Sequence, residues 1–586
     1  MQQKHASLSF TMIGLLVLTA CVPGGPSQGT GERTDGPRAP QAEKTIRIAI
    51  GDEPASWDNR ITGATGSGTT GGINNMDPLA QDGVRRSRGG GQYIELLAAE
   101  VPDAARGTWT VNPNGTMEMT WKIVPNALWH DGTPVTSADF EFAVRVRNDP
   151  VAAGLPTGSG AERLLSHVAP INEHAFVAHW QSVNVTVISG SGLVPLPKHL
   201  LDSVYQQRPG ELRQHRYFTT EFNGTGPFKL VHWEPGSHLE FSRFDEYYKG
   251  PAKLSRVFLQ IIPDANTMVA NILAGAVDVL SPPLVSIEQG LEIRDRWARE
   301  GSRNQVKVET RDGAETWEIM LNPQYARPLN GMTQQPVRQA LLQAVDRQNL
   351  ADVMTVGLSS IAYTFYHEEQ DNYPYVRDLV PPSDRRYEYP YDVRRAEQLL
   401  AQAGWTKGPD GVLVHQPSGE RFNYHVQTRR GDAYFRMASI IQDYWKAVGV
   451  DLDIEVLTPV NERNNEYLAT RTGASLHNAT TSSFQGRRAH SGAIPSPETR
   501  WTGNNRGHYS NPVVDGLVER LELTIDQPQI RELHRQLLAQ QMVDLHSFWW
   551  YWVVVPIIML EGVTGPHNVG SNVIAGNIWE WDYVKG

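Results

Sequence analysis

The chain of 586 residues contains a single cysteine, Cys21, so no internal disulfide bond and no cysteine-based zinc site can form. It also lacks the G-x-S-x-G turn of α/β-hydrolases and the H-E-x-x-H helix of zinc proteases. Acidic side chains (64) outnumber Lys and Arg (53), which argues against a nucleic-acid-binding surface. The sequence therefore nominates no catalytic residue, no metal ligand and no cofactor, although carboxylates far apart in sequence can still meet as an acid/base pair.

Long hydrophobic runs are also missing, because a bilayer-spanning helix needs about 20 apolar residues. The apolar run 10–20 follows the charged Lys4 and has the length of a signal peptide. It ends in Leu18-Thr19-Ala20-Cys21, which resembles the bacterial lipobox and predicts cleavage before a lipid-modified Cys21. The alternative is an ordinary core cysteine behind a plain signal peptide. Residues 21–44, rich in Gly, Pro and Ser, are expected to form a flexible tether.

A glycine-rich segment at residues 66–71 matches the pattern G-x-G-x-x-G. A dinucleotide site requires a strand directly before this pattern and a helix directly after it. Here about a dozen loop residues separate it from the first expected strand, so nucleotide binding is not favoured. We expect a loop at the mouth of a ligand cleft instead, with Gly66 and Thr69 as candidate ligand contacts.

The most informative pattern runs from Asn223 to Val279. Alternating residues flank the turn at 234–237, where Pro presets φ and Gly accepts a positive φ, so a hairpin is predicted. A strand around 257–262 follows, and then a helix through Leu273 that stops at Gly275. This order of a GTGPF turn, a W-x-P-G turn, an IPDA helix start and a G-x-V-D-V strand resembles family 5 of the extracytoplasmic solute-binding proteins of ABC transporters.

Other segments strengthen this resemblance. Residues 129–134, WHDGTP, precede a helix that begins near Ala138, with Thr136 and Asp139 in the positions of a capping box. The helix that starts at Pro336 ends in Val345-Asp346-Arg347, like the family's VRQAL-x-x-AIDR segment. Helices ending at Gly404 and Gly449 and a strand over 450–457 complete the pattern.

The resemblance implies an α/β fold of two lobes joined by crossover strands, the large family-5 variant of the type II periplasmic-binding-protein fold. The first lobe is expected over residues 45–312, with 555–586 returning to it, and the second over 313–554. A cleft between two lobes is the default ligand site.

The expected ligand contacts follow from the resemblance and from residue chemistry. Trp317 and Asn322 lie near the expected crossing between lobes, and Trp501 lies in a variable loop of the second lobe. Peptide-binding relatives commonly place an Asp in the loop corresponding to 476–492, to pair with a ligand ammonium, but here the loop has no Asp or Glu. The loop residues expected to contact the ligand are Asn478, Thr480, Thr481, Ser482, Phe484 and Arg487.

Without that carboxylate, an ammonium would lose a charge-assisted hydrogen bond worth roughly 1.5–3 kcal/mol. A neutral oligosaccharide or an anionic group therefore suits the loop better than a free peptide N-terminus. The alternative is that the acid comes from elsewhere and the loop only packs.

The sequence as a whole predicts a monomeric, lipid-anchored, extracytoplasmic receptor that captures a peptide or oligosaccharide and presents it to ABC permease subunits. Two other functions stay open: an anchored hydrolase, and a sensor or adhesion receptor on the same fold.

Overall fold

The computed structural model describes residues 43–584, apart from residues 63–71, 90–91, 154–162, 185–186, 189, 191, 281–284, 369–372, 382, 459, 480–484 and 568–573. The predicted signal peptide, Cys21 and most of the predicted tether lie outside the described residues. The described chain mixes helices and strands throughout, as the sequence predicted. None of its described helices combines the length and the apolar composition that crossing a bilayer requires.

The largest sheet has ten strands, in the order β17-β16-β18-β13-β19-β12-β1-β11-β10-β9. Its strands are β1 (Thr45–Ile50), β9 (Phe228–Glu234), β10 (His238–Arg243), β11 (Arg256–Ile261), β12 (Val279–Leu280), β13 (Gln305–Ile319), β16 (Asn423–Thr428), β17 (Asp451–Val456), β18 (Ala474–Ala479) and β19 (Ser547–Met559). The predicted first lobe contributes β12, β1, β11, β10 and β9 to this sheet, and the predicted second lobe contributes β17, β16 and β18. The two long strands β13 and β19 connect these sets.

The first-lobe part of this sheet follows the local sequence signals. Strands β9 and β10 form the predicted hairpin, and Gly236 in its turn has φ +75°. Helix α5 (Ala265–Leu273) begins after Asp264, whose carboxylate accepts a hydrogen bond from the Thr267 N–H, and Gly275 with φ +68° follows its end. Capping and a left-handed glycine thus fix both ends of the helix.

A second sheet of the first lobe holds five strands, in the order β4-β6-β8-β7, with β5 paired to β6. The strands are β4 (Ala98–Glu100), β5 (Trp109–Val111), β6 (Met117–Ile123), β7 (Leu165–Asn172) and β8 (Ala175–Trp180). Helix α3 (Ser137–Asn148) starts at the predicted capping box, where the Asp139 carboxylate accepts from the Thr136 N–H at 2.8 Å. Buried Trp121, Trp129 and Phe140 form the centre of this core.

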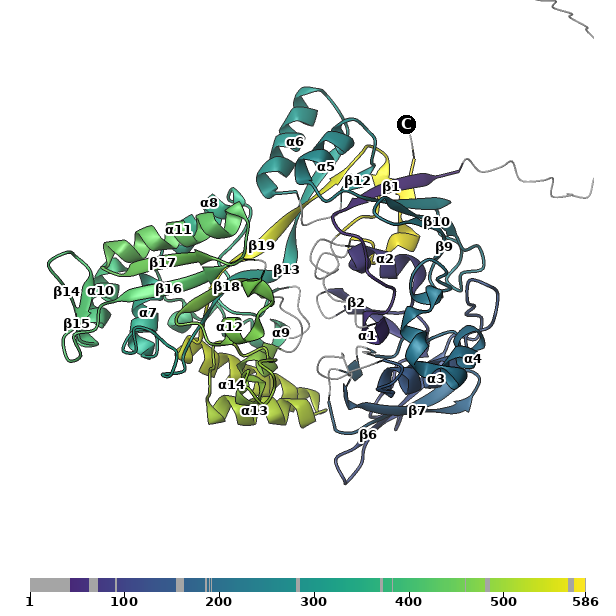
Figure 1. Cartoon of the computed structure of the whole chain (residues 1–586), viewed down its shortest axis with the longest axis horizontal. Coiled ribbons are helices and arrows are strands. Elements are labelled where there is room, and N and C mark those ends of the chain that lie inside the picture. The colour runs from purple at the N-terminus through teal and green to yellow at the C-terminus, as the bar shows by residue number, and fades with distance from the viewer. Residues whose placement is uncertain are drawn as a thin grey trace, which may run out of the picture. The chain divides into compact units, whose positions relative to one another are not determined.

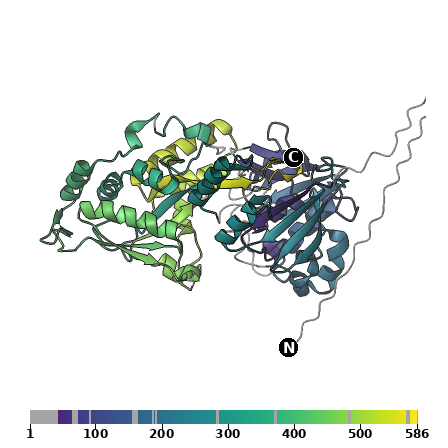
Figure 2. The same ribbon diagram turned by 90° about the horizontal axis from the view of Figure 1, so that it is seen from above.

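The second lobe packs helices against β16, β17 and β18. Helix α11 (Asp432–Ala447) runs beside β17 and β16, and the green helices of this part lie beside the green strands in both views (Figure 1 and Figure 2). Helices α7 (Gln335–Gln343) and α10 (Val393–Gln402) pack on each other. The Asp392 side chain caps α10, as predicted, and Gly449 after α11 has φ +92°.

Strands β13 and β19 pair antiparallel over most of their length. At one end β19 pairs with β12, and at the other end β13 pairs with β18. The register shifts between Thr310 and Ala314, close to the predicted boundary at 312/313. The lobe boundaries themselves stay predictions.

The C-terminal segment is bound to the first strand of the first lobe. Asp278, from the G-x-V-D-V segment, accepts hydrogen bonds from the Arg47 guanidinium at 2.8 and 2.9 Å and from the Tyr583 hydroxyl at 2.9 Å. Lys44 Nζ also lies 2.6 Å from Asp582 Oδ1. Polar contacts between residues more than 200 positions apart therefore hold the chain end beside β1.

The remaining α-helices and strands of the described chain complete the two lobes. They are α1 (Asn59–Thr62), α2 (Gly72–Ala80), α4 (Lys198–Gln207), α6 (Ile287–Arg299), α8 (Arg347–Thr355), α9 (Tyr373–Val376), α12 (Asn465–Ala469), α13 (Pro512–Leu523), α14 (Gln527–Asp544), β2 (Arg85–Gly89), β3 (Gln92–Glu95), β14 (Trp405–Lys407), β15 (Leu413–His415), β20 (Val563–Thr564) and β21 (Asp582–Tyr583).

Candidate functional site

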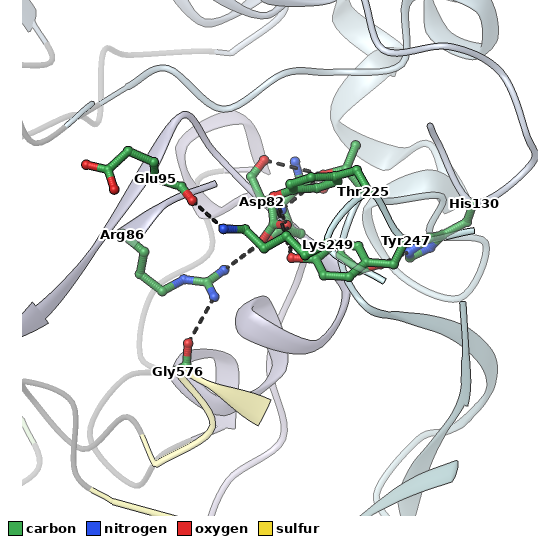
Figure 3. Close-up of polar contacts among 11 residues, drawn as sticks. Asp82, Arg86, Glu95, His130, Thr225, Tyr247, Lys249 and Gly576 are labelled. Carbon is green, nitrogen blue, oxygen red and sulfur yellow. Dashed lines mark hydrogen bonds and ion pairs between the residues drawn. The ribbon is translucent and has the colours of Figure 1, made fainter. Parts of the chain in front are cut away.

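The GTGPF turn of the first lobe lies between two sets of polar contacts, a buried network centred on Asp82 and the ring of His130 (Figure 3). The Asp82 side chain is fully buried, and its carboxylate accepts from the hydroxyls of Tyr247 and Tyr248, each at 2.8 Å. Arg86 Nη2 lies 3.2 Å from the same carboxylate. The backbone N–H of Asp82 donates to the Thr225 hydroxyl of the GTGPF turn. Burial raises the pKa of Asp82, while Arg86 and the two hydroxyls lower it.

The glycines of the GTGPF turn are needed because another backbone passes very close. A side-chain carbon on Gly224 would lie 1.9 Å from the Ala80 carbonyl oxygen, and one on Gly226 would lie 2.6 Å from the Ala80 carbonyl carbon. The ring of His130, from WHDGTP, contacts both ends of the turn: Nε2 lies 3.0 Å from Gly226 O and Nδ1 accepts from the Gly224 N–H. Burial lowers the pKa of His130 to about 3, so the ring is neutral. These contacts tie the two motifs to the core of the first lobe, which gives them a role in the fold.

In the second lobe, the surface best placed to contact a ligand is one edge of the sheet. Strand β16 is parallel to both β17 and β18, so Thr428, Val456 and Ala479 end their strands on the same side. Ligands of open α/β sheets bind outside the carboxyl ends of such strands. The predicted ligand loop leaves the sheet from this edge, and we call this edge of the sheet the carboxyl edge.

The structure corrects the start of that predicted loop. Residues 476–479 are not loop but the end of strand β18, paired with β13 so that Asn478 lies opposite Glu315. The expected loop missed this strand because its sequence, LHNA, has no strong β-forming residues; pairing with the long β13 overrides the weak local preference. Residues Thr480, Thr481, Ser482 and Phe484, like Gly66 and Thr69, lie outside the described residues, as do the side chains of Asn478 and Arg487.

Trp317 lies in the core of the second lobe. Its side chain is fully buried, with edge-to-face contacts to Trp445 (5.2 Å between ring centroids) and Trp550 (5.6 Å). Alternation along β13 turns residues 317 and 319 toward the helices of this core. As a ligand contact, Trp317 stays a prediction.

Asn322 lines a polar cavity of about 540 Å³, together with His508, Tyr509, Asn511, Arg338 and Asp544. Its amide is already engaged: Nδ2 lies 3.1 Å from His508 Nδ1, and Oδ1 accepts from the Gln324 N–H. The charged groups of the cavity are compensated as well. The Asp544 carboxylate accepts from Tyr509, Asn511 and Gln540, and the Arg338 guanidinium donates to backbone carbonyls of Met332, Thr333 and Asp544.

Trp501 lies in a short turn and is partly buried, with φ +60° and its N–H donated to Ser496 O at 2.8 Å. As a ligand contact, Trp501 stays a prediction.

The sequence did not reveal a pair of charged residues near the start of β18, where Glu318 lies opposite Ser475. Arg471 Nη2 lies 3.1 Å from Glu318 Oε2, and the two side chains are 1 % and 15 % exposed. They are 153 positions apart, so no spacing pattern predicts them. In the described part of the chain, no three His, Cys, Asp or Glu side chains are grouped so as to hold a metal ion.

Comparison with known proteins identifies the fold. The sequence model of the bacterial extracellular solute-binding proteins, family 5, matches residues 100–493. The chain belongs to this family. The predicted family and the two-lobed α/β fold are thereby confirmed.

The curated relatives have low sequence identity to this chain but align with it over long stretches. The oligopeptide-binding protein AppA of Bacillus subtilis is 25% identical over 465 residues, covering 77% of this chain and 78% of AppA. The nickel-binding protein NikA of Staphylococcus aureus is 25% identical over 333 residues, 55% of this chain and 57% of NikA. The solved structure of Bacillus subtilis AppA in complex with a nonapeptide superposes with a TM-score of 0.69 at 19% identity, covering 93% of this chain and 100% of that one. At this identity the structural likeness shows the fold alone.

Proposed function

We propose that this protein is the extracytoplasmic receptor of an ABC importer, which captures a peptide-sized solute between its two lobes and delivers it to membrane permease subunits. The family match over residues 100–493 carries the proposal. The course of the largest sheet supports it, because β13 and β19 connect first-lobe strands to second-lobe strands. Such paired crossing strands are a suitable hinge for lobe closure.

The mechanism follows from differential binding. A ligand shifts an open–closed equilibrium only through contacts that differ between the two states. Groups on the carboxyl edge of the second lobe would supply such contacts when they meet a solute held by the first lobe. Closure would also exclude water, and polar contacts are stronger in a site of low dielectric constant.

Among possible solutes, we favour one that is not recognised through a free ammonium group. The relatives named above include an oligopeptide-binding protein, but residues 476–492 of this chain provide no carboxylate. Oligosaccharides and anionic peptides both fit this composition, through the hydroxyl, amide and arginine groups of the loop.

Membrane attachment is part of the proposal. Cys21 at the end of the apolar segment would carry lipid, and residues 22–44 would tether the receptor to the membrane surface. Each buried CH₂ of the lipid contributes about 0.8 kcal/mol to anchoring. Mass spectrometry of the protein from its own host should find an acyl-modified N-terminal cysteine, and this modification should disappear in the Cys21→Ser variant.

Two measurements test the receptor function. Native mass spectrometry of protein purified from its own host should reveal a bound small molecule that is released unchanged on denaturation. Small-angle scattering should show that the protein becomes more compact when this molecule is added back. Recovery of a chemically altered molecule would instead support the anchored hydrolase.

The sensor or adhesion alternative shares the same binding lobes. It differs in its partners, so the neighbouring genes discriminate: two permease and two ATPase genes favour import. Uptake of labelled solute by cells with and without the receptor gene decides between them.

A further inference from the structure

Helices α6 and α11 rest on the same strand, β19, on either side of the predicted lobe boundary at 554/555. Helix α6 lies directly against the first-lobe part of β19, because a side-chain carbon on Gly290 would lie 2.6 Å from Pro556 Cβ. Helix α11 contacts the second-lobe part, where the Tyr551 hydroxyl donates to Met437 Sδ at 3.6 Å. A bend in β19 between these two contacts would therefore carry the two helices with different lobes.

An ion pair connects these two helices across the predicted boundary. Arg436 Nη2 lies 2.6 Å from Glu288 Oε1, and the two side chains are 46 % and 41 % exposed. Arg436 directly precedes Met437 in α11, and Glu288 lies two residues before Gly290 in α6. Since the helices rest on different parts of the strand, rotating one lobe against the other changes the distance between these two charges.

A second contact between the lobes is apolar. The short connection between α13 and α14 contains Ile525, and the next residue, Asp526, caps α14 by accepting from the Gln529 N–H. A hydrophobic residue directly before a capping residue commonly packs on the fourth residue of its own helix, here Ile530. The Ile525 side chain also contacts the other lobe: it is partly buried and packs against the core of the five-stranded sheet.

These two contacts matter more for the position of the lobes than for the fold of either lobe. An exposed ion pair contributes little to the stability of a folded chain. An open–closed equilibrium is more sensitive, because a contact made in only one of the two states shifts the balance by its full free energy. Both contacts consist of protein groups alone, so they act on this balance whether or not a solute is present.

We propose that the Glu288–Arg436 ion pair and the packing of Ile525 on the first lobe form an interlobe clasp, which holds the two lobes together and regulates how readily the receptor opens. This inference rests on the proposed receptor function and adds a determinant of its affinity outside the ligand contacts. A solute held between the lobes stabilises the closed form, so a contact that favours closure also raises the apparent affinity. The clasp residues thus adjust affinity without touching the solute.

Distance measurements between two spin labels test the clasp. In a Cys21→Ser background the chain has no other cysteine, so labels can be attached through Ile171→Cys and Val513→Cys. Both residues are exposed, and they lie in β7 of the first lobe and α13 of the second. Pulsed electron double resonance then gives the ratio of open to closed molecules with no solute added.

Two variants should open the labelled protein. Ile525→Ser should raise the ratio of open to closed molecules about fivefold, because the burial of part of an apolar side chain is lost. Arg436→Gln should raise the ratio about two- to threefold, as expected for an exposed ion pair. High salt should abolish the effect of Arg436→Gln by screening the charges and leave the effect of Ile525→Ser in place.

Matched controls separate the clasp from a general effect of substitution. Leu523→Ser removes an exposed apolar side chain at the end of α13, and Arg430→Gln breaks the ion pair with Glu462 inside the second lobe. Both should keep the distances of the unmodified labelled protein. Glu288→Arg should open the protein by placing two positive charges together, and adding Arg436→Glu should close it again.

Unchanged distances in Ile525→Ser and Arg436→Gln overturn the clasp. Opening by only one of these variants, or equal opening by the controls, overturns it as well. Failure of the reversed ion pair to restore closure would show that the charges at positions 288 and 436 do not act on each other. All these outcomes leave the receptor function intact, since that function is judged separately by the co-purified solute and its release unchanged.

Discussion

Two buried carboxylates, one in each lobe, have different surroundings. Asp82 in the first lobe has one guanidinium and two hydroxyl donors, all within hydrogen-bond distance. Glu318 in the second lobe pairs with Arg471, whose Nε–H is buried and has no hydrogen-bond partner among the described residues. Several donors around one buried acceptor stabilise the fold more than a pair that leaves one of its donors unused.

The largest loss of stability is expected when the Asp82 network of the first lobe is broken. Asp82→Ala leaves Arg86, Tyr247 and Tyr248 buried without their acceptor, which should lower the free energy of unfolding by about 3–5 kcal/mol. Urea denaturation followed by tryptophan fluorescence measures this loss. Asp410→Ala, which breaks an exposed ion pair with Arg421, is the control and should shift the midpoint far less. A similar shift in both variants would mean that the Asp82 network does not hold the first lobe together.

A smaller loss of stability is expected at Glu318. Glu318→Gln keeps the shape of the side chain but removes the charged partner of Arg471, so the free energy of unfolding should fall by about 1.5–3 kcal/mol. Urea denaturation measures this loss. A free energy of unfolding equal to that of the unmodified protein would show that Arg471 does not need the charge of Glu318.

The buried His130 makes the stability of the first lobe depend on pH. Burial holds the folded pKa of His130 at about 3, below its unfolded value, so its stabilising effect is complete above about pH 6.5 and is lost as the pH falls toward the folded pKa. The loss is about 1.4 kcal/mol per pH unit for one such histidine. Burial also lowers the pKa of His367, His534 and His546, each to about 4, so urea titrations between about pH 7 and pH 5 should show at least this slope. His130→Gln should reduce the slope by the contribution of one proton. An unchanged slope in the variant would mean that His130 does not titrate on unfolding.

The smallest effect on stability is expected at Arg506. Arg506→Gln removes an Nε–H group that is buried without a partner and one contact with the Asn465 amide, so the free energy of unfolding should change by less than about 1 kcal/mol. Thermal denaturation without ligand measures it. A loss as large as that of Asp82→Ala would show that Arg506 supports the fold, and the contrast between the two lobes would disappear.

Local signals in the sequence predicted many elements correctly. The Asp264 and Asp392 caps, the Thr136/Asp139 capping box and the Gly236 turn all lie where they were expected. Each of these depends on atoms within about four residues of one another, which the sequence displays directly. The ligand contacts were harder to predict from local patterns. The structure places Trp317 in the core and the Asn322 amide against His508.

The sequence by itself determined the family, the alternation of strands and helices, and the lack of an acid in residues 476–492. Tertiary structure alone decided that 476–479 continue the sheet, and that Glu318 pairs with Arg471, 153 positions away. The reason is physical: caps, turns and periodicity act along a few residues, whereas charge neighbourhoods arise where strands pair across hundreds of positions.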